Sequence, residues 1–297
     1  MEVKLFGQKG VSSMNLTKQD RNQLADGHQM PKLGLGLYKV TDEAVMQKLL
    51  AGAYETGYRL FDTAQMYQNE AMIGRALQAL PVQRDEFFIT TKIAEANQGY
   101  DATLRSLEQS LKDLQLDYVD LLLVHWPLHQ HFFETWRAFE RAKAEGMVRS
   151  IGTSNYGQIH LEYLATKANE LPVVNQVEVH PYLTQKPLQT FTNEHNIVTQ
   201  AWAPLGRGGE LSDPLVVSLA EKYQKSPAQI VIRWHLQNQT ALIPKSSHVE
   251  RVQANMDVFD FEITNDDMQA LDDLNQFKRI SQEPELVYER GAQYPHH

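Results

Sequence analysis

The stretch Phe61-Asp62-Thr63-Ala64-Gln65-Met66-Tyr67 joins a short apolar run to a helix-like run over residues 70–80. It carries an acid and a phenol at the join, with four residues between them. A tyrosine has an ordinary pKa of about 10, so it exchanges protons poorly at neutral pH. A neighbouring cation would lower that pKa, and the cation would need an acidic anchor of its own. The stretch predicts a strand, a loop that bears catalytic groups, and a helix.

Two further apolar runs end in groups that suit this chemistry, because residues 87–92 end in a lysine and residues 119–125 end in a histidine. Alone, each candidate has a plain structural explanation: a turn cap, a packed ring, a solvated lysine or a satisfied core histidine. In a barrel of parallel strands, however, the carboxyl ends of the strands share one face, where loops build active sites. The residues predicted to form one proton-transfer site there are Asp62, Tyr67, Lys92 and His125.

The composition, with 297 residues, 42% hydrophobic and 22% charged, is ordinary for a soluble globular protein with a sizeable core. A formal net charge of -9 argues against nucleic acid as a partner. Since there is no cysteine, disulfides and thiolate chemistry are excluded. The first ten residues do not resemble a signal peptide, and no run approaches the length of a membrane span. We therefore expect a cytoplasmic enzyme with no membrane partner.

The N-terminal region is polar and weakly patterned, so we expect residues 1–22 to be an extension. Met14 is a candidate internal start, and both the origin of residues 1–13 and that of the terminal His296-His297 pair stay open. An Asp26-Gly27 pair between apolar segments predicts a β-hairpin. With no linker or repeat beyond it, residues 23–297 are expected to form a single domain.

Strand-like and helix-like runs alternate through this domain. The expected strands are 33–36, 60–62, 87–92, 119–124, 148–152, 173–178, 197–203 and 241–244. The expected helices include 43–55, 101–114, 132–145 and 188–195, where apolar residues recur at helical spacing. Eight strands with intervening helices predict the α/β class and a (β/α)8 TIM barrel. The rival doubly wound sheet would need a G-x-G-x-x-G turn after its first strand, and the sequence has none.

A series of short motifs, in order along the chain, resembles the aldo-keto reductase superfamily from about Leu24 to about Gln282. The motifs are residues 34–36, 57–64, 67–70, 122–127, 152–156, 175–178 and 243–246. Residues 201–208 resemble the prokaryotic 2,5-diketo-D-gluconate reductase-like branch. The resemblance implies hydride transfer from NADPH to an aldehyde or ketone, with Tyr67 as proton donor. It further implies that Lys92 lowers the pKa of Tyr67, that Asp62 holds Lys92, and that His125 orients the substrate oxygen.

The resemblance also implies an NADPH/NADP+ site. Its positions are Ser154, Asn155 and Gln176 for the nicotinamide carboxamide, Trp202 for ring stacking, Leu205, Gly206 and Arg207 for the pyrophosphate, Lys245, Ser246 and Arg251 for the 2′-phosphate, and Asn255 for adenine. The plain alternatives are turn and cap residues, a core tryptophan and a solvated helix start. Two departures, His248 and Ala254, weaken the expected strictness toward NADPH.

On the substrate side, Tyr38 and Trp126 match aromatic pocket positions above a floor of Tyr67 and His125. The segment 128–134 is short for the family, which implies an open pocket for aldehydes, α-dicarbonyls or keto-sugars. The tail after residue 275, which includes Phe277, Ile280 and Leu286, is expected to form a C-terminal loop over the active-site face. We expect a monomer, the family's commonest state.

Two other functions stay open. One is a cofactor-binding regulatory subunit with little turnover, since some proteins of this fold mainly modulate partners. The other is a metal-dependent barrel hydrolase that uses the clustered His125, His129 and His131. No carboxylate completes a convincing ligand set for these histidines, so we expect no metal.

Overall fold

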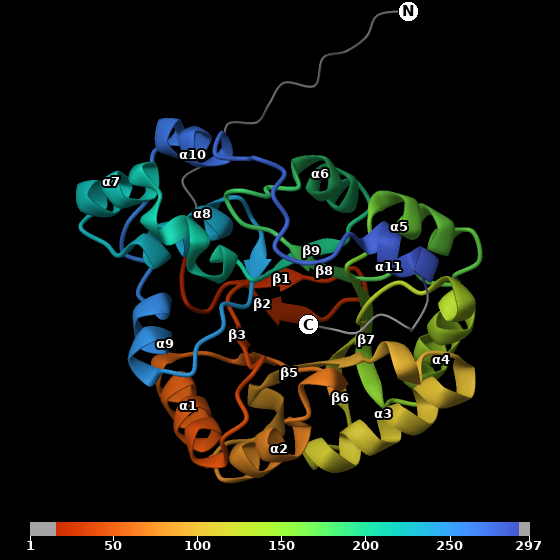
Figure 1. Ribbon diagram of the computed structural model, residues 1–297. Coiled ribbons are helices and arrows are strands. Elements are labelled where there is room, and N and C mark those ends of the chain that lie inside the picture. Colours follow the sequence, from red (N-terminus) through yellow and green to blue (C-terminus); the bar gives the residue numbers. More distant parts are fainter. Residues whose placement is uncertain (1–15, 291–297) are drawn as a thin grey trace, which may run out of the picture.

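The computed structural model describes residues 16–290, and within this range eight parallel strands form one sheet whose order follows the sequence. The first and last strands meet through parallel bridges from Leu33 to Leu242 and from Gly36 to Lys245. The amide of Gly34 donates to the carbonyl of Leu242 at 2.9 Å. The sheet therefore closes, and the predicted (β/α)8 barrel is confirmed (Figure 1).

The strands of the barrel are β3 (Leu35–Gly36), β4 (Leu60–Asp62), β5 (Phe88–Ile93), β6 (Val119–Val124), β7 (Val148–Ser154), β8 (Val174–Glu178), β9 (Val198–Trp202) and β10 (Ala241–Leu242). The helices that follow them are α1 (Glu43–Thr56), α2 (Glu70–Gln78), α3 (Tyr100–Leu114), α4 (Phe132–Ala144), α5 (Gln158–Ala165), α6 (Lys186–Glu194), α8 (Pro227–Gln237) and α9 (Val249–Met256). Further helices are α7 (Pro214–Tyr223), α10 (Asn265–Asp272) and α11 (Pro284–Arg290).

Local sequence explains why these elements begin and end where they do. The carboxylate of Asp42 accepts from the amide of Val45 at 2.9 Å and so caps the start of α1. Gly57 ends the same helix at a φ of 114°, a conformation that glycine adopts without steric cost. Strands β5 and β6 are buried along their full lengths, as expected for parallel strands covered on both faces.

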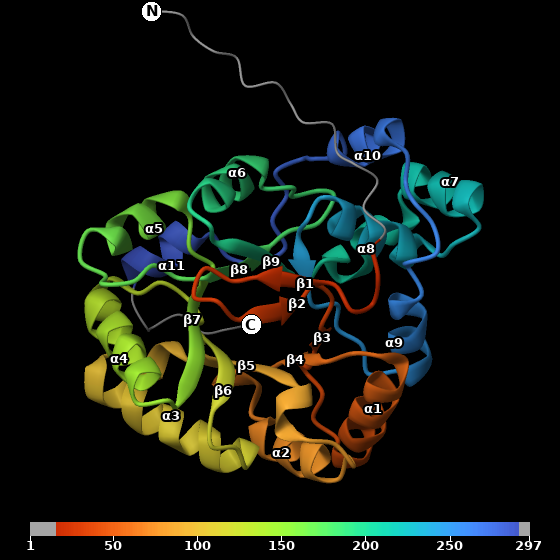
Figure 2. The ribbon, with the colours of Figure 1, turned by 180° about the vertical axis from the view of Figure 1, so that it is seen from behind.

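A hairpin closes the amino-terminal end of the barrel. It consists of β1 (Arg21–Gln23) and β2 (Gln29–Pro31), which pair in antiparallel orientation around the predicted Asp26-Gly27 turn. The hairpin buries Leu24 and Met30 against residues at the beginnings of the barrel strands. Figure 2 shows it lying across the barrel. Because this end is plugged, the opposite, carboxyl end is left for a functional site.

Several boundaries differ from those expected. Strand β1 begins at Arg21 and Leu16 is buried in the core, so residues 16–22, expected to be part of an extension, belong to the folded domain. Residues 1–13, Met14 and the terminal histidine pair lie outside the described residues. Strand β10 ends at Leu242, two residues before the predicted limit, because Pro244 has no amide hydrogen with which to continue the ladder. Helices were expected between all eight strands, but the sequence reasoning gave no bounds for α5, α7, α8, α10 and α11.

The end of the described chain returns to the barrel. The amides of Gln276 and Lys278 both donate to the carbonyl of Tyr182, at 3.0 and 3.1 Å. In α11, Val287 packs with Trp126 and Leu128, which follow β6. The tail therefore covers loops at the carboxyl end of the strands, as predicted. Within residues 16–290, no helix is both long and apolar enough to cross a membrane.

We predict that Gly74→Ala destabilises the protein. A Cβ at Gly74 in α2 would come within 2.5 Å of the carbonyl oxygen of Asp113, where only backbone lies in the way. Such overpacking costs about 1–3 kcal/mol, which exceeds the gain from a better helix former. The measurement is the urea unfolding midpoint. Gly209→Ala is the control, because nothing lies within 4 Å of its Cβ position; equal midpoints for the two variants would contradict the argument.

Candidate active site

The four predicted catalytic residues meet at the carboxyl end of the barrel. Asp62 ends β4, Lys92 lies near the end of β5, and His125 directly follows β6. Tyr67 ends the short 3-10 helix η1 (Gln65–Tyr67) that leads away from β4. Its hydroxyl oxygen lies 3.5 Å from Nζ of Lys92, and its ring centroid lies 5.9 Å from that of His125. The shared strand ends bring together groups from three successive strand–helix units.

The lysine and the acid form a buried ion pair. Nζ of Lys92 donates to Oδ1 of Asp62 at 2.5 Å and to the carbonyl of Thr63 at 2.8 Å. Burial raises the pKa of Asp62 and lowers the pKa of Lys92, because each charged form loses its hydration, and the contact between them opposes both shifts. The ammonium thus has two short hydrogen bonds, and Tyr67 lies at the longer distance.

The expectation that Lys92 brings the pKa of Tyr67 below its ordinary value is not met in this structure. Burial raises the pKa of the phenol well above its ordinary value, and the negative charge of Asp62 adds to the rise. The physical reason is that desolvation and the negative charge of Asp62 together outweigh the stabilisation that Lys92 gives the phenolate from 3.5 Å. Tyr67 is therefore held in its protonated form, which is the form that donates a proton.

An amide inside the barrel completes the anchoring of Asp62. Nε2 of Gln176 donates to Oδ2 of Asp62 at 2.7 Å and to Oε1 of Gln200 at 2.8 Å. Both hydrogens of this amide are thereby used, and the amide orientation is set by its two acceptors. The sequence reasoning did not name Gln200. Its position in β9, level with Gln176 in β8, was the signal that could have found it.

The predicted substrate residues flank the phenol. The ring of Tyr38 lies 4.9 Å from that of Tyr67 and is 40% exposed, so it forms an open wall of the site. Trp126 is buried next to His125, and its carbonyl accepts from Nε2 of Gln98 at 2.8 Å. The phenol therefore has an exposed aromatic side chain on one side and a buried one near the histidine.

The residues predicted to hold a carboxamide lie beside this group and are already linked to one another. Oγ of Ser154 donates to the carbonyl of Gln176 at 2.8 Å. Nδ2 of Asn155 donates to the carbonyl of His125 at 2.9 Å, and its Oδ1 accepts from Nε1 of Trp202 at 2.8 Å. Asn155 adopts a φ of 61°, in the left-handed region that asparagine tolerates. These bonds hold the indole and the amide in one fixed arrangement.

The positions predicted for the pyrophosphate open η5 (Gly206–Ser212). Leu205 is half-buried and Gly206 is buried, while Arg207 is exposed. Gly206 and Arg207 have φ values of 50° and 54°, so the backbone turns sharply here. The loop lies directly after Trp202 and thus continues the row of candidate cofactor residues.

The positions predicted for the 2′-phosphate surround the start of α9. Lys245 and Arg251 are exposed, and neither forms an ion pair with an acid among residues 16–290. Oγ of Ser246 donates to the carbonyl of His248 at 3.1 Å, so part of its role is the plain one of shaping the helix start. Asn255 is buried farther along α9.

A second lysine, Lys39, belongs to this group, and the sequence reasoning missed it. Although Lys245 is largely exposed, partial desolvation lowers its pKa, and the nearby charge of Lys39 lowers the pKa further. The barrel closure explains the proximity, since Gly36 pairs with Lys245 across the first and last strands. Neither lysine forms an ion pair with an acid in the described part of the chain, so the two cations, which follow the first and last strands of the barrel, would suit phosphate oxygens.

Comparisons with known proteins agree with this geometry. The model of the Aldo/keto reductase family matches residues 32–213 and 210–276. The chain belongs to the aldo/keto reductase family. A glyoxal reductase of Bacillus subtilis is 42% identical to this reductase over 276 residues, which are 93% of this chain and 100% of that protein. A methylglyoxal reductase DkgA of Yersinia pestis is 41% identical over 275 residues, which are 91% and 98% of the two chains.

Solved structures support the same assignment of this aldo/keto reductase. A mutant of Gox0644 in complex with NADPH is 41% identical, has a TM-score of 0.86, and covers 91% of this chain and 98% of its own. The resemblance inferred from the motifs is therefore confirmed, and the relatives agree with the prokaryotic 2,5-diketo-D-gluconate reductase-like branch.

The histidines considered for a metal are not assembled in this reductase. His125 faces Tyr67, whereas His129 and His131 lie exposed in η4 (His129–His131). Among residues 16–290, no group of three or more histidine or acidic side chains is placed to hold a metal ion. The geometry gives the hydrolase alternative no support.

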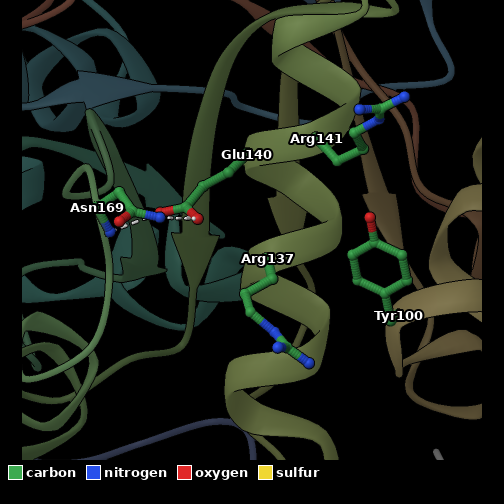
Figure 3. A pocket seen from close by; sticks show the side chains of 5 residues that line it. All are labelled: Tyr100, Arg137, Glu140, Arg141 and Asn169. Carbon is green, nitrogen blue, oxygen red and sulfur yellow. Dashed lines mark hydrogen bonds between the residues drawn. The ribbon is translucent and has the colours of Figure 1, made fainter.

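A surface hollow of about 540 Å³ lies away from the catalytic group of the reductase. Its lining residues are Tyr100, Arg137, Glu140, Arg141 and Asn169 (Figure 3). The carboxylate of Glu140 accepts two hydrogen bonds from Asn169, one from its backbone amide at 2.7 Å and one from Nδ2 at 2.8 Å. None of the four catalytic candidates lines this hollow, so we do not assign it to the substrate.

Proposed function

We propose that this aldo/keto reductase reduces small aldehydes and α-dicarbonyls with NADPH, and that Tyr67 donates the proton. Family membership, the reductase relatives and the NADPH-bound relative confirm the reaction class and the cofactor. The observation that carries the proposed residue roles is the buried Asp62–Lys92 pair next to the phenol of Tyr67.

In the proposed reaction, Tyr67 protonates the carbonyl oxygen of the substrate while hydride reaches the carbonyl carbon, so that an alcohol forms. The nicotinamide supplies the hydride when it is bound. Negative charge develops on the phenol oxygen as its proton leaves, and Lys92, 3.5 Å away, stabilises that charge. Asp62 and Gln176 keep Lys92 in place, and His125 orients the carbonyl oxygen.

The donors present fit an NADPH molecule. Lys39, Lys245 and Arg251 supply cationic groups for phosphate oxygens, without competing acids among the described residues. Since both amide hydrogens of Gln176 are used within the protein, its free acceptor Oε1 is the atom available to a carboxamide. Trp202 supplies a flat ring next to Asn155 for stacking.

The substrate class follows from the openness of the site. The segment between β6 and α4 is short, and Tyr38 is 40% exposed, so little protein covers the phenol from that side. The glyoxal and methylglyoxal reductases among the relatives act on small dicarbonyls by name. We propose the same class for this chain, with keto-sugars as a second group.

The regulatory-subunit alternative predicts binding without turnover. A panel of glyoxal, methylglyoxal, simple aldehydes and keto-sugars, followed by oxidation of NADPH, distinguishes the two functions. Tight NADPH binding with no turnover of any member would favour the alternative. We further propose that the protein is cytoplasmic and monomeric; sedimentation of the full chain tests the second point.

We predict that Arg251→Ala weakens NADPH binding by roughly ten- to hundred-fold. A charge-assisted hydrogen bond contributes about 1.5–3 kcal/mol, and NADH lacks the phosphate that receives it. Binding of NADH should therefore change little. The measurement is the Kd of each cofactor by quenching of intrinsic fluorescence. Equal losses for both cofactors would mean that Arg251 supports the fold or a shared part of the cofactor.

A further inference from the structure

A buried ionic cluster follows the carboxyl end of β8, and the proposed reaction does not use it. Its members are Glu178 at the end of β8, His180 just after it, and Glu210 in η5, each at most 1% exposed. Nε2 of His180 lies 3.2 Å from Oε1 of Glu178, and its Nδ1 lies 2.5 Å from Oε1 of Glu210. The imidazole thus joins the strand end to the loop of η5.

The loop that Glu210 belongs to has an unfavourable backbone conformation. Ala203, Gly206, Arg207 and Gly208 all have φ values between 45° and 92°. Left-handed conformations cost roughly 1–2 kcal/mol for each residue other than glycine, so they persist only where the surroundings enforce them. Ala203 and Arg207 carry that cost here.

Glu210 is placed to enforce this shape. A Cβ added to Gly206 would overlap the carboxylate of Glu210, so the carboxylate lies directly against the loop backbone. The carboxylate oxygens have no hydrogen bond to any described residue apart from the close contact with His180. His180 is therefore its anchor within the described part of the chain.

Glu178 ties the same cluster to the C-terminal tail. Its Oε1 accepts from the amide of Ile280 at 2.6 Å, and its Oε2 lies 3.9 Å from Nη1 of Arg279. Gln176, which holds Asp62, lies two residues earlier on the same strand. One histidine thus connects the strand that supports the catalytic acid, the proposed pyrophosphate loop and the tail.

We propose that His180 is a positioning residue for the cofactor. Through Glu210, His180 fixes the conformation of the Leu205–Arg207 loop. This inference rests on the proposed function, because that function assigns the Leu205–Arg207 loop to the pyrophosphate of NADPH. The loop is then shaped before NADPH arrives, so binding does not have to order it. We call the group of Glu178, His180 and Glu210 the loop latch.

The charges around His180 favour its protonated form. Burial alone would lower the pKa of His180, but the contacts with Glu178 and Glu210 outweigh burial and raise the pKa above its ordinary value. From the tail, Arg279 faces Glu178 rather than the imidazole. From α8, His235 lies near, and burial lowers its pKa to about 3, so it stays neutral. The latch therefore contains one imidazolium between two carboxylates.

The raised pKa sets the direction of the pH dependence. The contribution of the latch is complete below the ordinary histidine pKa of about 6.5 and is lost as the pH rises through the raised folded-state pKa. The dissociation rate of NADPH from the parent protein should therefore increase as the pH rises above about 6.5 and through the raised pKa of His180. In His180→Gln this dependence should be absent.

The decisive variant is Glu210→Gln, tested with Asp213→Asn as a matched control. Both remove one negative charge from the same segment, which by electrostatics alone would favour binding of an anion. Asparagine keeps the helix-capping acceptor that Asp213 provides for the amide of Leu215. If the latch holds the loop, Glu210→Gln should weaken NADPH binding roughly tenfold, as expected for a lost charge-assisted contact, and Asp213→Asn should not.

Hydrogen exchange of the loop amides in the cofactor-free chain tests the latch without relying on NADPH. Gly206 and Gly208 donate to the carbonyls of Ala203 and Leu205, so both amides are protected while the loop keeps its shape. Glu210→Gln and His180→Gln should each raise their exchange rates roughly tenfold, the factor expected for a lost charge-assisted contact, with unchanged rates in the barrel strands. Unchanged loop rates in both variants would overturn the latch.

The two readouts separate the inference from the function on which it rests. A parent protein that does not bind NADPH overturns the proposed function and the cofactor role of His180. A parent that binds NADPH, with variants that exchange and bind like the parent, overturns the latch and leaves the function intact. If His180→Gln folds poorly, the result for Glu210→Gln alone tests the latch, because glutamine removes the negative charge of Glu210 and keeps the shape of its side chain.

Discussion

Replacement of Tyr67 by phenylalanine is expected to lower kcat for a simple aldehyde by about 10²–10⁴-fold, the range in which general acid catalysis contributes. The structure gives the reason, because burial holds the phenol protonated and its hydroxyl faces Lys92 at 3.5 Å. The ring itself packs against Tyr38, and phenylalanine preserves that contact. The variant should fold and should bind NADPH within a few-fold of the parent.

The measurement is single-turnover oxidation of NADPH by the Tyr67→Phe variant, with its cofactor Kd as the control. Tyr38→Phe is the matched variant, since it removes a neighbouring hydroxyl from the wall of the site without touching the ion pair. A Tyr67→Phe enzyme that keeps most of its kcat would remove Tyr67 from the role of proton donor. Loss of activity in Tyr38→Phe alone would transfer that role to Tyr38.

Lys92→Met is expected to reduce kcat by roughly 10²–10³-fold. This is the effect usually seen when one preorganised group that stabilises developing charge is removed. The charge in question is that of the phenolate formed as Tyr67 donates its proton. Without the ammonium, Asp62 would be a buried carboxylate with only the amide of Gln176 as a neutral donor. The single variant is therefore also expected to lose stability.

The double variant Asp62→Asn with Lys92→Met separates these two effects. It removes both charges, so no buried ion is left unpaired, and stability should recover toward that of the parent. Activity should stay low, because the phenolate still lacks a cation. If the double variant regained the parent's kcat, Lys92 would serve only to neutralise Asp62. Urea unfolding and kcat, measured on the same three proteins, give the answer.

Much of the fold was predictable from local pattern. The limits expected for β4 and β6 agree with the structure to the residue, because each strand is mostly apolar and a polar side chain, Asp62 or His125, marks its carboxyl end. The Asp26-Gly27 turn of the hairpin was equally clear. The placement of Lys92 and His125 at the carboxyl ends of their strands also followed from sequence, since parallel strands share their polarity.

Local pattern failed where an element has little periodicity of its own. Strand β10 contains only Ala241 and Leu242, and its place in the sheet depends on the bridge to Leu33 at the other end of the barrel. The helices α7 and α8 lie within one long connection between β9 and β10, where the sequence reasoning expected an intervening helix but gave no bounds. The place of β10 depends on packing against a distant segment, whereas α7 and α8 begin at local caps, Asp213 and Ser226, each followed by a proline.

The sequence alone determined the family, the barrel and the catalytic residue types, because these depend on motif order and on the periodicity of apolar residues. Only the tertiary structure decided which residues touch. Gln176 reaches Asp62 from 114 positions away, and Lys39 approaches Lys245 only because the barrel closes. The pKa of Tyr67 was predicted in the wrong direction for the same reason: desolvation and the distance of each charge are properties of the folded chain, and no local pattern encodes them.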